Sequence, residues 1–393
     1  MTLESTRAVE IVDLTDTELR ARGGIKWTMP GPDVLAAWVA ESDVAPAPVI
    51  TAQLHALVDR GDFGYPPVDA DTGVPEVFSQ FARRRWDWAV DPSRVVLTGD
   101  VMAGVLLALT TLCDKAPVVV PTPSYPPFLD VVTLAGLPLV TVPIDPAGPA
   151  ELDLERIAGA LEAGARTVLL SNPHNPWGRA FRRDELEGLR DVVTQHGARV
   201  ISDEIHAPLV LPGATHVPYA SLDGTAGHAT TVLSASKAWN LPGLKCAQIV
   251  AGDDQDLALL RGVPVIANHG VATPGIAATL AAYGEGEPWL DAWLQRLGDN
   301  RDLFTRLVAE RLPGVRMRPL EATYLAWLDV RALGFGDADQ PNPSEVAVQR
   351  GRVLVNDGRT FGPGGDGHVR VNLATSAERI ERIVDGLAHA WLD

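Results

Sequence analysis

The sequence has few cysteines and no long apolar run, and each absence excludes a class of protein. Only two cysteines occur, Cys113 and Cys246, which excludes a disulfide framework and a zinc spacing, so no metal is expected. No apolar run is long enough to cross a bilayer, and the first residues lack the basic start and apolar core of a secretory signal. We therefore expect a soluble protein of the reducing cytoplasm, with no membrane partner.

Lysine is also scarce in this chain. Of the 33 lysines and arginines only four are lysines, namely Lys26, Lys115, Lys237 and Lys245. A lysine that forms a covalent bond to a cofactor therefore has four candidates.

The bulk composition is that of an ordinary globular protein. Of the 393 residues, 46% are hydrophobic and 21% are charged, and a chain of this length is expected to form two domains. The formal net charge of −17 repels polyanions, so nucleic acid is not expected as a partner.

Between Arg94 and Val250 the chain repeats one unit, a short β-branched run followed by a loop and a stretch of helical periodicity. Because the runs are apolar almost throughout, they suit strands that helices cover on both faces. We predict an α/β fold with a mostly parallel seven-stranded sheet. The strands are expected in RVVLTG, APVVVPTP, PLVTVPI, RTVLLSNP, ARVISDEI, TTVLSAS and CAQIVAG.

The character of the sequence changes after about Pro288, where a Trp-rich helix, further strands and a closing helix are predicted. We therefore divide the chain into three parts. Residues 1–48 form an N-terminal segment that packs with the small domain, 49–287 form the large domain and 288–393 form a smaller α/β C-terminal domain.

Polar residues follow several of the predicted strands, at the edge where ligands bind in open α/β sheets. The loop at Asp100 to Gly104 enters a helix, whose free N–H groups and dipole could hold a phosphate, although this signal alone is weak. Tyr125 stands on a proline-stiffened loop, where its ring could stack on a planar group or simply lie half buried with its hydroxyl in water.

Two further loops carry polar groups at the same edge. SNPHNPWG is a rigid turn that can aim the amide of Asn175,. Asp203 directly follows an apolar run, and a buried carboxylate there needs a cationic partner, which a ligand could supply. Glu204 points the other way along the strand, so we expect it to be structural and to pair with an arginine.

Lys237 is the decisive residue. It follows an apolar strand and the two hydroxyls of Ser234 and Ser236, and Lys245 lies a short distance further on. Surface lysines usually stand among other charges on helices, so chance placement explains this one poorly.

Together these residues are what pyridoxal phosphate requires at one sheet edge. Lys237 would condense with its aldehyde, Asp203 would keep its ring nitrogen protonated, and Asn175 would donate to its phenolate oxygen. Displaced by the substrate, Lys237 would become a free amine suited to removing the Cα proton. The expected cofactor-binding residues are Val101, Met102, Tyr125, Asn175, Asp203, His206, Ser234, Ser236, Lys237 and Lys245.

The motifs SNPHNPWG, SDEIH, SASK and HVRVNLA resemble the fold-type I aminotransferase family, class I/II, over nearly the whole chain. This resemblance implies an aminotransferase-like large domain. It also implies that Arg370, in HVRVNLA, grips the substrate carboxylate, and the planar guanidinium suits a bidentate contact.

Within that family, WVAESD at 38–43, FGYPP at 63–67 and ATYLAWLD resemble the MalY/PatB group of cystathionine β-lyases, also called C–S lyases. His206, in place of the tyrosine more usual in aminotransferases, points the same way. By this resemblance Tyr65 would reach the phosphate of the neighbouring subunit, which implies a homodimer with shared active sites. The implied substrate-binding residues are Trp38, Ala40, Tyr125, Asn175 and Arg370.

Three segments depart from the pattern of that group. Met102-Ala103 replaces a Val-Pro pair, Pro208 stands where an acidic residue is usual, and Asn356-Asp357-Gly358 replaces an ending in Ser-Pro-Gly. We expect the cofactor chemistry to survive these changes and the recognition of the substrate side chain to differ.

Two reactions of an amino acid remain open. In β-elimination the Cα proton is removed and a thiolate leaves from Cβ, which yields pyruvate and ammonia. Transamination shares the first step and releases a 2-oxo acid instead. The MalY/PatB likeness favours elimination. A non-catalytic cofactor-binding regulator is a remote alternative, because such proteins carry a DNA-binding domain and the N-terminal segment here is short and acidic.

Overall fold

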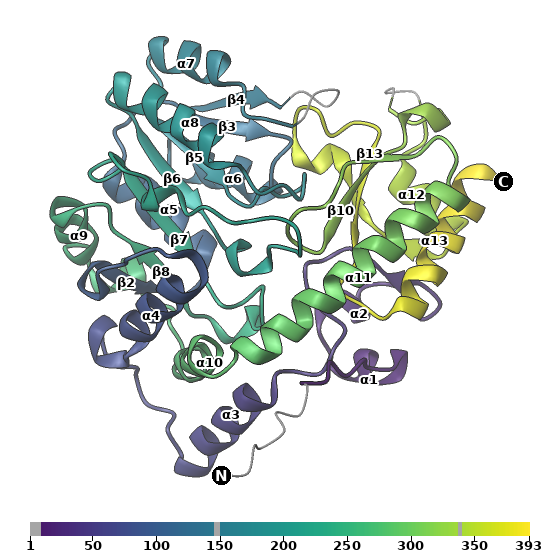
Figure 1. The fold of residues 1–393 in the computed structure, drawn as a ribbon, viewed down its shortest axis with the longest axis horizontal. Coiled ribbons are helices and arrows are strands. Elements are labelled where there is room, and N and C mark those ends of the chain that lie inside the picture. The colour runs from purple at the N-terminus through teal and green to yellow at the C-terminus, as the bar shows by residue number, and fades with distance from the viewer. Residues whose placement is uncertain (1–8, 145–149, 337–339) are drawn as a thin grey trace.

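The computed structural model describes residues 9–144, 150–336 and 340–393. Figure 1 shows two main β-sheets side by side with helices packed around them, and the long helix α11 (Glu287–Arg311) runs from the region of one sheet to that of the other. No helix in these three ranges is long and apolar enough to cross a membrane.

The larger sheet has seven strands in the order β2-β8-β7-β6-β5-β3-β4. Every strand runs in one direction except β8, which is antiparallel to β2 and β7. The predicted α/β fold with a mostly parallel seven-stranded sheet is therefore confirmed, and each of the seven predicted runs holds one strand. The strands are β2 (Val95–Thr98), β3 (Val118–Thr122), β4 (Leu139–Pro143), β5 (Thr167–Ser171), β6 (Arg199–Asp203), β7 (Ala229–Leu233) and β8 (Ala247–Val250).

Helices cover both faces of this sheet, which explains why its strands are apolar almost throughout. One face packs against α5 (Val101–Leu112), α6 (Pro126–Leu134) and α9 (Asp254–Arg261). The other face packs against α7 (Leu154–Glu162) and α8 (Arg183–Gln195).

The second sheet is antiparallel, with the order β12-β13-β10-β9. It shares one hydrophobic core with α11, α12 and α13. The elements are β9 (Arg316–Met317), β10 (Leu325–Asp329), α12 (Pro343–Gln349), β12 (Asn356–Asp357), β13 (His368–Asn372) and α13 (Ala377–Leu392).

The N-terminal segment, from residue 9 on, contacts elements that lie far along the chain. After α1 (Asp16–Ala21) and α2 (Ile25–Thr28), strand β1 (Leu35–Ala36) pairs in parallel with β11 (Val353–Leu354), far along the chain. The chain then enters α3 (Pro48–Arg60) and α4 (Val74–Trp86), which pack on α10 (Thr273–Gly284). Short 3₁₀ turns connect the elements, at Asp69–Thr72, Pro92–Arg94, Ala207–Leu209, Tyr219–Ser221, Pro242–Leu244, Val265–Asn268, Arg331–Leu333 and Gly358–Phe361.

Helix α5 lies close to the sheet because a glycine faces the strands. A Cβ atom added at Gly104 would lie 2.8 Å from Val232 Cγ1 and 3.0 Å from Thr98 Cγ2. Both neighbours are β-branched and fully buried, so they cannot turn away easily. Gly104 therefore sets the distance of α5, and of its N-terminus, from the sheet.

We expect Gly104→Ala to destabilise the protein by about 1–3 kcal/mol through overpacking, although alanine is the better helix former. Gly159→Ala in α7 is the matched control, because nothing lies within 4 Å of a Cβ there, and it should stabilise by about 0.5–1 kcal/mol. The midpoints of urea denaturation measure both changes. Equal midpoints for Gly104→Ala and the wild type would contradict the close packing of α5.

Candidate active site

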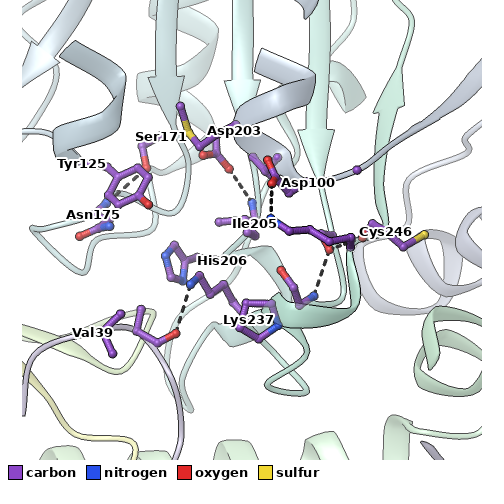
Figure 2. Close-up of a pocket in the computed structure, with 18 of the residues that line it drawn as sticks. Val39, Asp100, Tyr125, Ser171, Asn175, Asp203, Ile205, His206, Lys237 and Cys246 are labelled. Carbon is purple, nitrogen blue, oxygen red and sulfur yellow. Dashed lines mark hydrogen bonds and ion pairs between the residues drawn. The ribbon is translucent and has the colours of Figure 1, made fainter. Parts of the chain in front are cut away.

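A cavity of about 250 Å³ opens at the carboxyl ends of the parallel strands. Figure 2 shows Tyr125 and Asn175 on one side of it, Asp100 and Cys246 on the other, and His206 and Lys237 below Asp203. Most of the sequence-predicted site residues line this cavity, from segments far apart in the chain. They are Ala40, Val101, Met102, Tyr125, Asn175, Asp203, His206, Ser234, Ser236, Lys237, Lys245 and Arg370.

Two of the predicted residues do not line the cavity. The indole Nε1 of Trp38 donates to the carbonyl of Lys26 at 3.0 Å, and only the main-chain carbonyl of Trp38 comes near the site, 3.4 Å from Arg370 Nη2. Tyr65 is 93% exposed, outside this cavity. A role for the Tyr65 side chain in a neighbouring subunit stays a prediction.

Lys237 lies just beyond the end of β7 with its amine buried in the cavity. The Nζ atom donates to the carbonyl of Ala40 at 3.1 Å. Burial, with a contribution from the charge of Arg370, lowers the pKa of Lys237 from 10.5 to about 8, because the charged form loses its hydration. A far larger share of the amine is therefore neutral, and nucleophilic, near physiological pH than for an ordinary lysine.

Asp203 is the last residue of β6, and its side chain is 5% exposed. Its Oδ1 accepts from the main-chain N–H of Ile205 at 2.9 Å. Burial, which outweighs this bond, raises the pKa of Asp203 from 3.8 to about 7, and the neighbouring Glu204 adds to the shift. A protonated ring nitrogen would supply the positive charge that this carboxylate needs to stay ionised.

Glu204 points away from the cavity, as its place in the strand predicts, but its partner is not an arginine. Its carboxylate contacts His216 Nε2 at 2.9 Å and accepts from the Ser202 hydroxyl and the Tyr219 N–H, also at 2.9 Å. The expected arginine pair is therefore wrong. A fully buried carboxylate can be satisfied by several hydrogen-bond donors as well as by one arginine.

Arg370, in β13, reaches the cavity from the second sheet. Its Nη1 donates to Asn175 Oδ1 at 3.0 Å and its Nη2 to Asn356 Oδ1 at 2.7 Å. The centre of the Phe361 ring lies 5.0 Å from its guanidinium carbon. These partners are neutral, the buried Nε has no hydrogen-bond partner among the residues that the structure describes, and burial lowers the pKa of Arg370 to about 10. The arginine is therefore fixed in place with its charge available to a carboxylate.

Tyr125 and His206, the remaining residues predicted to contact the cofactor ring, both line the cavity. Tyr125 follows β3 at the start of α6, and burial raises the pKa of its phenol. The imidazole of His206 stands 6.4 Å from the ring of Tyr324, and burial lowers its pKa to about 3, so it is neutral. Its Nδ1 is buried and has no partner in the described part of the chain, which leaves this atom available to a ligand in the cavity.

The far side of the cavity is built from the start of α5 and the segment before β8. Because β8 runs against the other strands, its first residues reach the same edge, which brings in Lys245. Lys245 Nζ donates to Asp100 Oδ2 at 2.7 Å, and the Ser234 hydroxyl donates to the Cys246 carbonyl at 2.6 Å. With the first turn of α5, these groups form an end of the cavity suited to a phosphate.

The segment Trp38–Asp43, which we call the strap, forms the wall opposite the large sheet. Its main-chain carbonyls accept hydrogen bonds from side chains in or next to both sheets. The carbonyl of Ala40 accepts from Lys237 and Tyr324, that of Val39 from Asn372 in β13, and that of Ser42 from Asn240. Sequence reasoning missed the use of these carbonyls, since a backbone oxygen leaves no mark in a motif.

The strap is anchored by a buried ion pair. Lys26 and Asp43 are 2% and 1% exposed, and their charged atoms lie 3.0 Å apart. Lys26 Nζ also donates to the carbonyl of Glu41 at 2.8 Å, and Trp27 Nε1 donates to Asp43 at 2.7 Å. Breaking such a pair leaves an uncompensated charge in the core, so the anchor holds the strap rigidly.

Three observations test whether these residues fit pyridoxal phosphate. Among the described residues, the buried Asp203 carboxylate has no cation within bonding distance and the His206 Nδ1 has no partner, and the partly neutral Lys237 amine lies in the same cavity. Each is explained by a ring with a protonated nitrogen, a polar substituent and an aldehyde. The fold and this cavity therefore define an enzyme of the pyridoxal-phosphate-dependent class.

Comparison with known proteins identifies the family. Residues 39–387 match the family model of aminotransferase class I and II, and the chain belongs to that family. It is 38% identical to cystathionine beta-lyase of Corynebacterium glutamicum, over 93% of this chain and 95% of the relative. It is 32% identical to cystathionine beta-lyase PatB of Bacillus subtilis, over 93% of this chain and 96% of the relative.

A solved structure agrees with this assignment. A protein of Corynebacterium diphtheriae, provisionally described as a PLP-dependent beta-cystathionase, superposes with a TM-score of 0.91 at 33% identity, covering 98% of this chain and 100% of the other. The predicted family, its likeness to the MalY/PatB group, the cofactor and the enzymatic nature of the protein are thereby confirmed.

The lowered pKa of Lys237 predicts how the cofactor-free protein takes up pyridoxal phosphate. Only the neutral amine attacks the aldehyde, and its share grows as pH rises through about 8 rather than through the ordinary 10.5,. Stopped-flow absorbance from pH 6 to pH 10 should therefore show a rate that rises and then levels off above about pH 8–9. A rate that still climbs tenfold per pH unit above pH 9, as for a simple alkyl amine measured in parallel, would refute the lowered pKa.

Proposed function

We propose that the protein is a pyridoxal-phosphate-dependent C–S β-lyase that cleaves a cysteine thioether to a thiol, pyruvate and ammonia. The observation that carries elimination over other reactions of this cofactor is the likeness to cystathionine β-lyases along almost the entire chain. The cavity supports it with the groups that the reaction requires at one site: an amine, an acid for the ring nitrogen and a carboxylate-binding arginine.

The chain's own residues divide the work. Arg370, held by Asn175 and Asn356, binds the substrate carboxylate and so fixes the amino acid in one orientation,. Asp203, as a carboxylate, would keep the ring nitrogen of the cofactor protonated. Lys237, once freed by the substrate, removes the Cα proton and returns a proton later in the cycle. The bound cofactor supplies an electron sink for the charge that develops at Cα.

The freed Lys237 amine has a defined resting place in the protein. The carbonyl of Ala40 already accepts a hydrogen bond from it at 3.1 Å, and Tyr324 donates to the same carbonyl at 3.1 Å. When the amine leaves this acceptor, Tyr324 keeps the carbonyl satisfied, so the movement leaves no orphan polar group.

Transamination is the alternative, and the family itself favours it, because the matched family is that of aminotransferases. Both reactions share the removal of the Cα proton, and the residues described above serve either. The two differ in whether a thiolate leaves from Cβ before the proton is returned.

Product analysis decides between the two reactions. With L-cystathionine or an S-alkyl-cysteine we expect the holoenzyme to release pyruvate and free thiol in equal amounts. Amino transfer is assayed separately, with a 2-oxo acid as acceptor. Transfer of the amino group without pyruvate release would replace the lyase proposal by the aminotransferase.

Lys237→Ala tests the central residue of either reaction. We expect this variant to lose the absorbance band of the lysine-bound cofactor and at least about a thousandfold in kcat, since it lacks both the covalent anchor and the base. Lys115→Ala, at an exposed position, is the control and should keep both. A Lys237→Ala protein with the wild-type spectrum would exclude Lys237 as the anchor.

We further propose that the enzyme is a homodimer in which Tyr65 completes the neighbouring site. Phe63, Tyr65 and Val68 are 70–93% exposed, and so are Val265 and Ile266, at 79% and 83%. The Thr273 hydroxyl donates to the Gly64 carbonyl at 2.9 Å, which ties the first of these segments to the start of α10. Exposed large apolar side chains such as these are typical of subunit interfaces.

Mixing two inactive variants tests the shared site. Tyr65→Ala should weaken cofactor binding in the neighbouring subunit, and Lys237→Ala is inactive. Subunit exchange between the two should restore activity to about a quarter of wild type, because half of the dimers are hybrids and each hybrid has one intact site. Mixed and separate variants of equal activity would show that Tyr65 does not act across an interface.

The compartment and the domain boundaries are also proposals. We place the enzyme in the cytoplasm, because Cys113 and Cys246 are unpaired thiols,. We divide the chain at 48 and 287, so that the second boundary coincides with the start of α11.

A further inference from the structure

Asp100 brings a negative charge to the end of the cavity where a phosphate is expected. Its Oδ1 accepts from the Ala103 N–H at 2.8 Å, as the N-cap of α5, and its Oδ2 accepts from Lys245 Nζ at 2.7 Å. The carboxylate of Asp100 thus already pairs with both groups that favour an anion at this place, the N-terminus of α5 and the Lys245 amine.

A bound phosphate and the Asp100 carboxylate need the same partners. Of the cations that line the cavity, Lys237 and Arg370 serve its other parts, which leaves Lys245 for the phosphate end. Its charge is neutralised by Asp100 in the cofactor-free protein. Phosphate carries close to two negative charges at neutral pH, so its approach to an ionised carboxylate costs free energy unless the carboxylate moves away or releases Lys245.

Asp100 stays ionised and is able to move. Burial acts to raise its pKa, but the hydrogen bonds from Lys245 and from main-chain N–H groups outweigh burial and hold the pKa of Asp100 below its usual value. Within a single subunit the side chains of Asp100 and Lys245 are 42% and 50% exposed. An ion pair this exposed is weak, so water can replace either partner at small cost.

We propose that Asp100 is a substitute anion for the cofactor phosphate. In the cofactor-free protein it holds Lys245 and the start of α5 in place, and it gives up Lys245 when the phosphate binds. Asp100 therefore lowers the affinity for the cofactor and speeds its exchange, while it keeps the empty site ordered. This inference rests on the pyridoxal phosphate site but not on the reaction that the enzyme catalyses.

The opposite effect would follow if Asp100 served to orient Lys245. That lysine has a left-handed backbone conformation, with φ 57°, and its amine is held by Asp100. Removing the carboxylate would then disorder the amine and weaken phosphate binding. The two roles predict changes of opposite sign.

Asp100→Asn separates the two roles, because asparagine also caps helices and retains the acceptor for Ala103 while it removes the charge. We expect the dissociation constant of pyridoxal phosphate, titrated into the cofactor-free protein by absorbance, to fall on the order of tenfold. Inorganic phosphate, which has no aldehyde, should also raise the melting temperature of cofactor-free Asp100→Asn more than that of wild type.

The matched control is Asp153→Asn. Asp153 caps α7 through the Arg156 N–H at 3.0 Å and pairs with the Arg156 guanidinium at 3.2 Å, so it shares the cap and the ion pair but lies outside the cavity. Its substitution should leave both binding measurements unchanged. Unchanged or weaker binding of both probes to Asp100→Asn would overturn the proposal. Because neither readout involves turnover, this result is independent of whether the enzyme eliminates or transaminates.

Discussion

The site depends on one physical constraint, the removal of ionisable groups from water at the carboxyl edge of the large sheet. Burial moves the pKa of Lys237 down to about 8, that of Asp203 up to about 7 and that of Arg370 down to about 10. None of the three has an oppositely charged partner at bonding distance among the contacts described above. Each group is therefore available for an interaction with a ligand. The cofactor would interact with Lys237 and Asp203, and the substrate carboxylate with Arg370.

The fold meets this constraint through strand direction. Parallel strands end at one edge, so the residues after β3, β5, β6 and β7 converge there without long loops,. The reversed strand β8 begins where the others end, which brings Lys245 to the same edge. The second sheet supplies Arg370, and its guanidinium is bonded both to Asn175 of the large sheet and to Asn356 beside it. The substrate-binding arginine thus joins the two sheets.

Much of this arrangement could be predicted from the sequence, and the rest could not for identifiable reasons. Apolar runs revealed the strands, and the polar residues behind them revealed Lys237 and Asp203, because parallel topology converts sequence position into a place at one edge. In the sequence Asn356 stands out only as a departure from the pattern of the MalY/PatB group, because its contact with Arg370 depends on the pairing of β12 with β13. Asp100 is a helix-cap residue by pattern, and nothing in the pattern reveals Lys245 as its partner. The direction of the Trp38 side chain, which lies outside the cavity, could not be predicted, because a short irregular segment has no regular alternation that fixes which groups point inward.

The strap also makes the order of synthesis matter for this enzyme. Its carbonyls at Val39 and Ala40 are held by Asn372, Tyr324 and Lys237, so this segment waits for partners that are synthesised much later. The large sheet can form earlier, but one wall of its cavity cannot close until residue 372 has emerged. Until Tyr324 and Asn372 hold the strap, the Ala40 carbonyl that accepts from Lys237 is not fixed at the cavity. The surroundings of this lysine are complete only when two segments 333 positions apart, at Val39 and Asn372, have met.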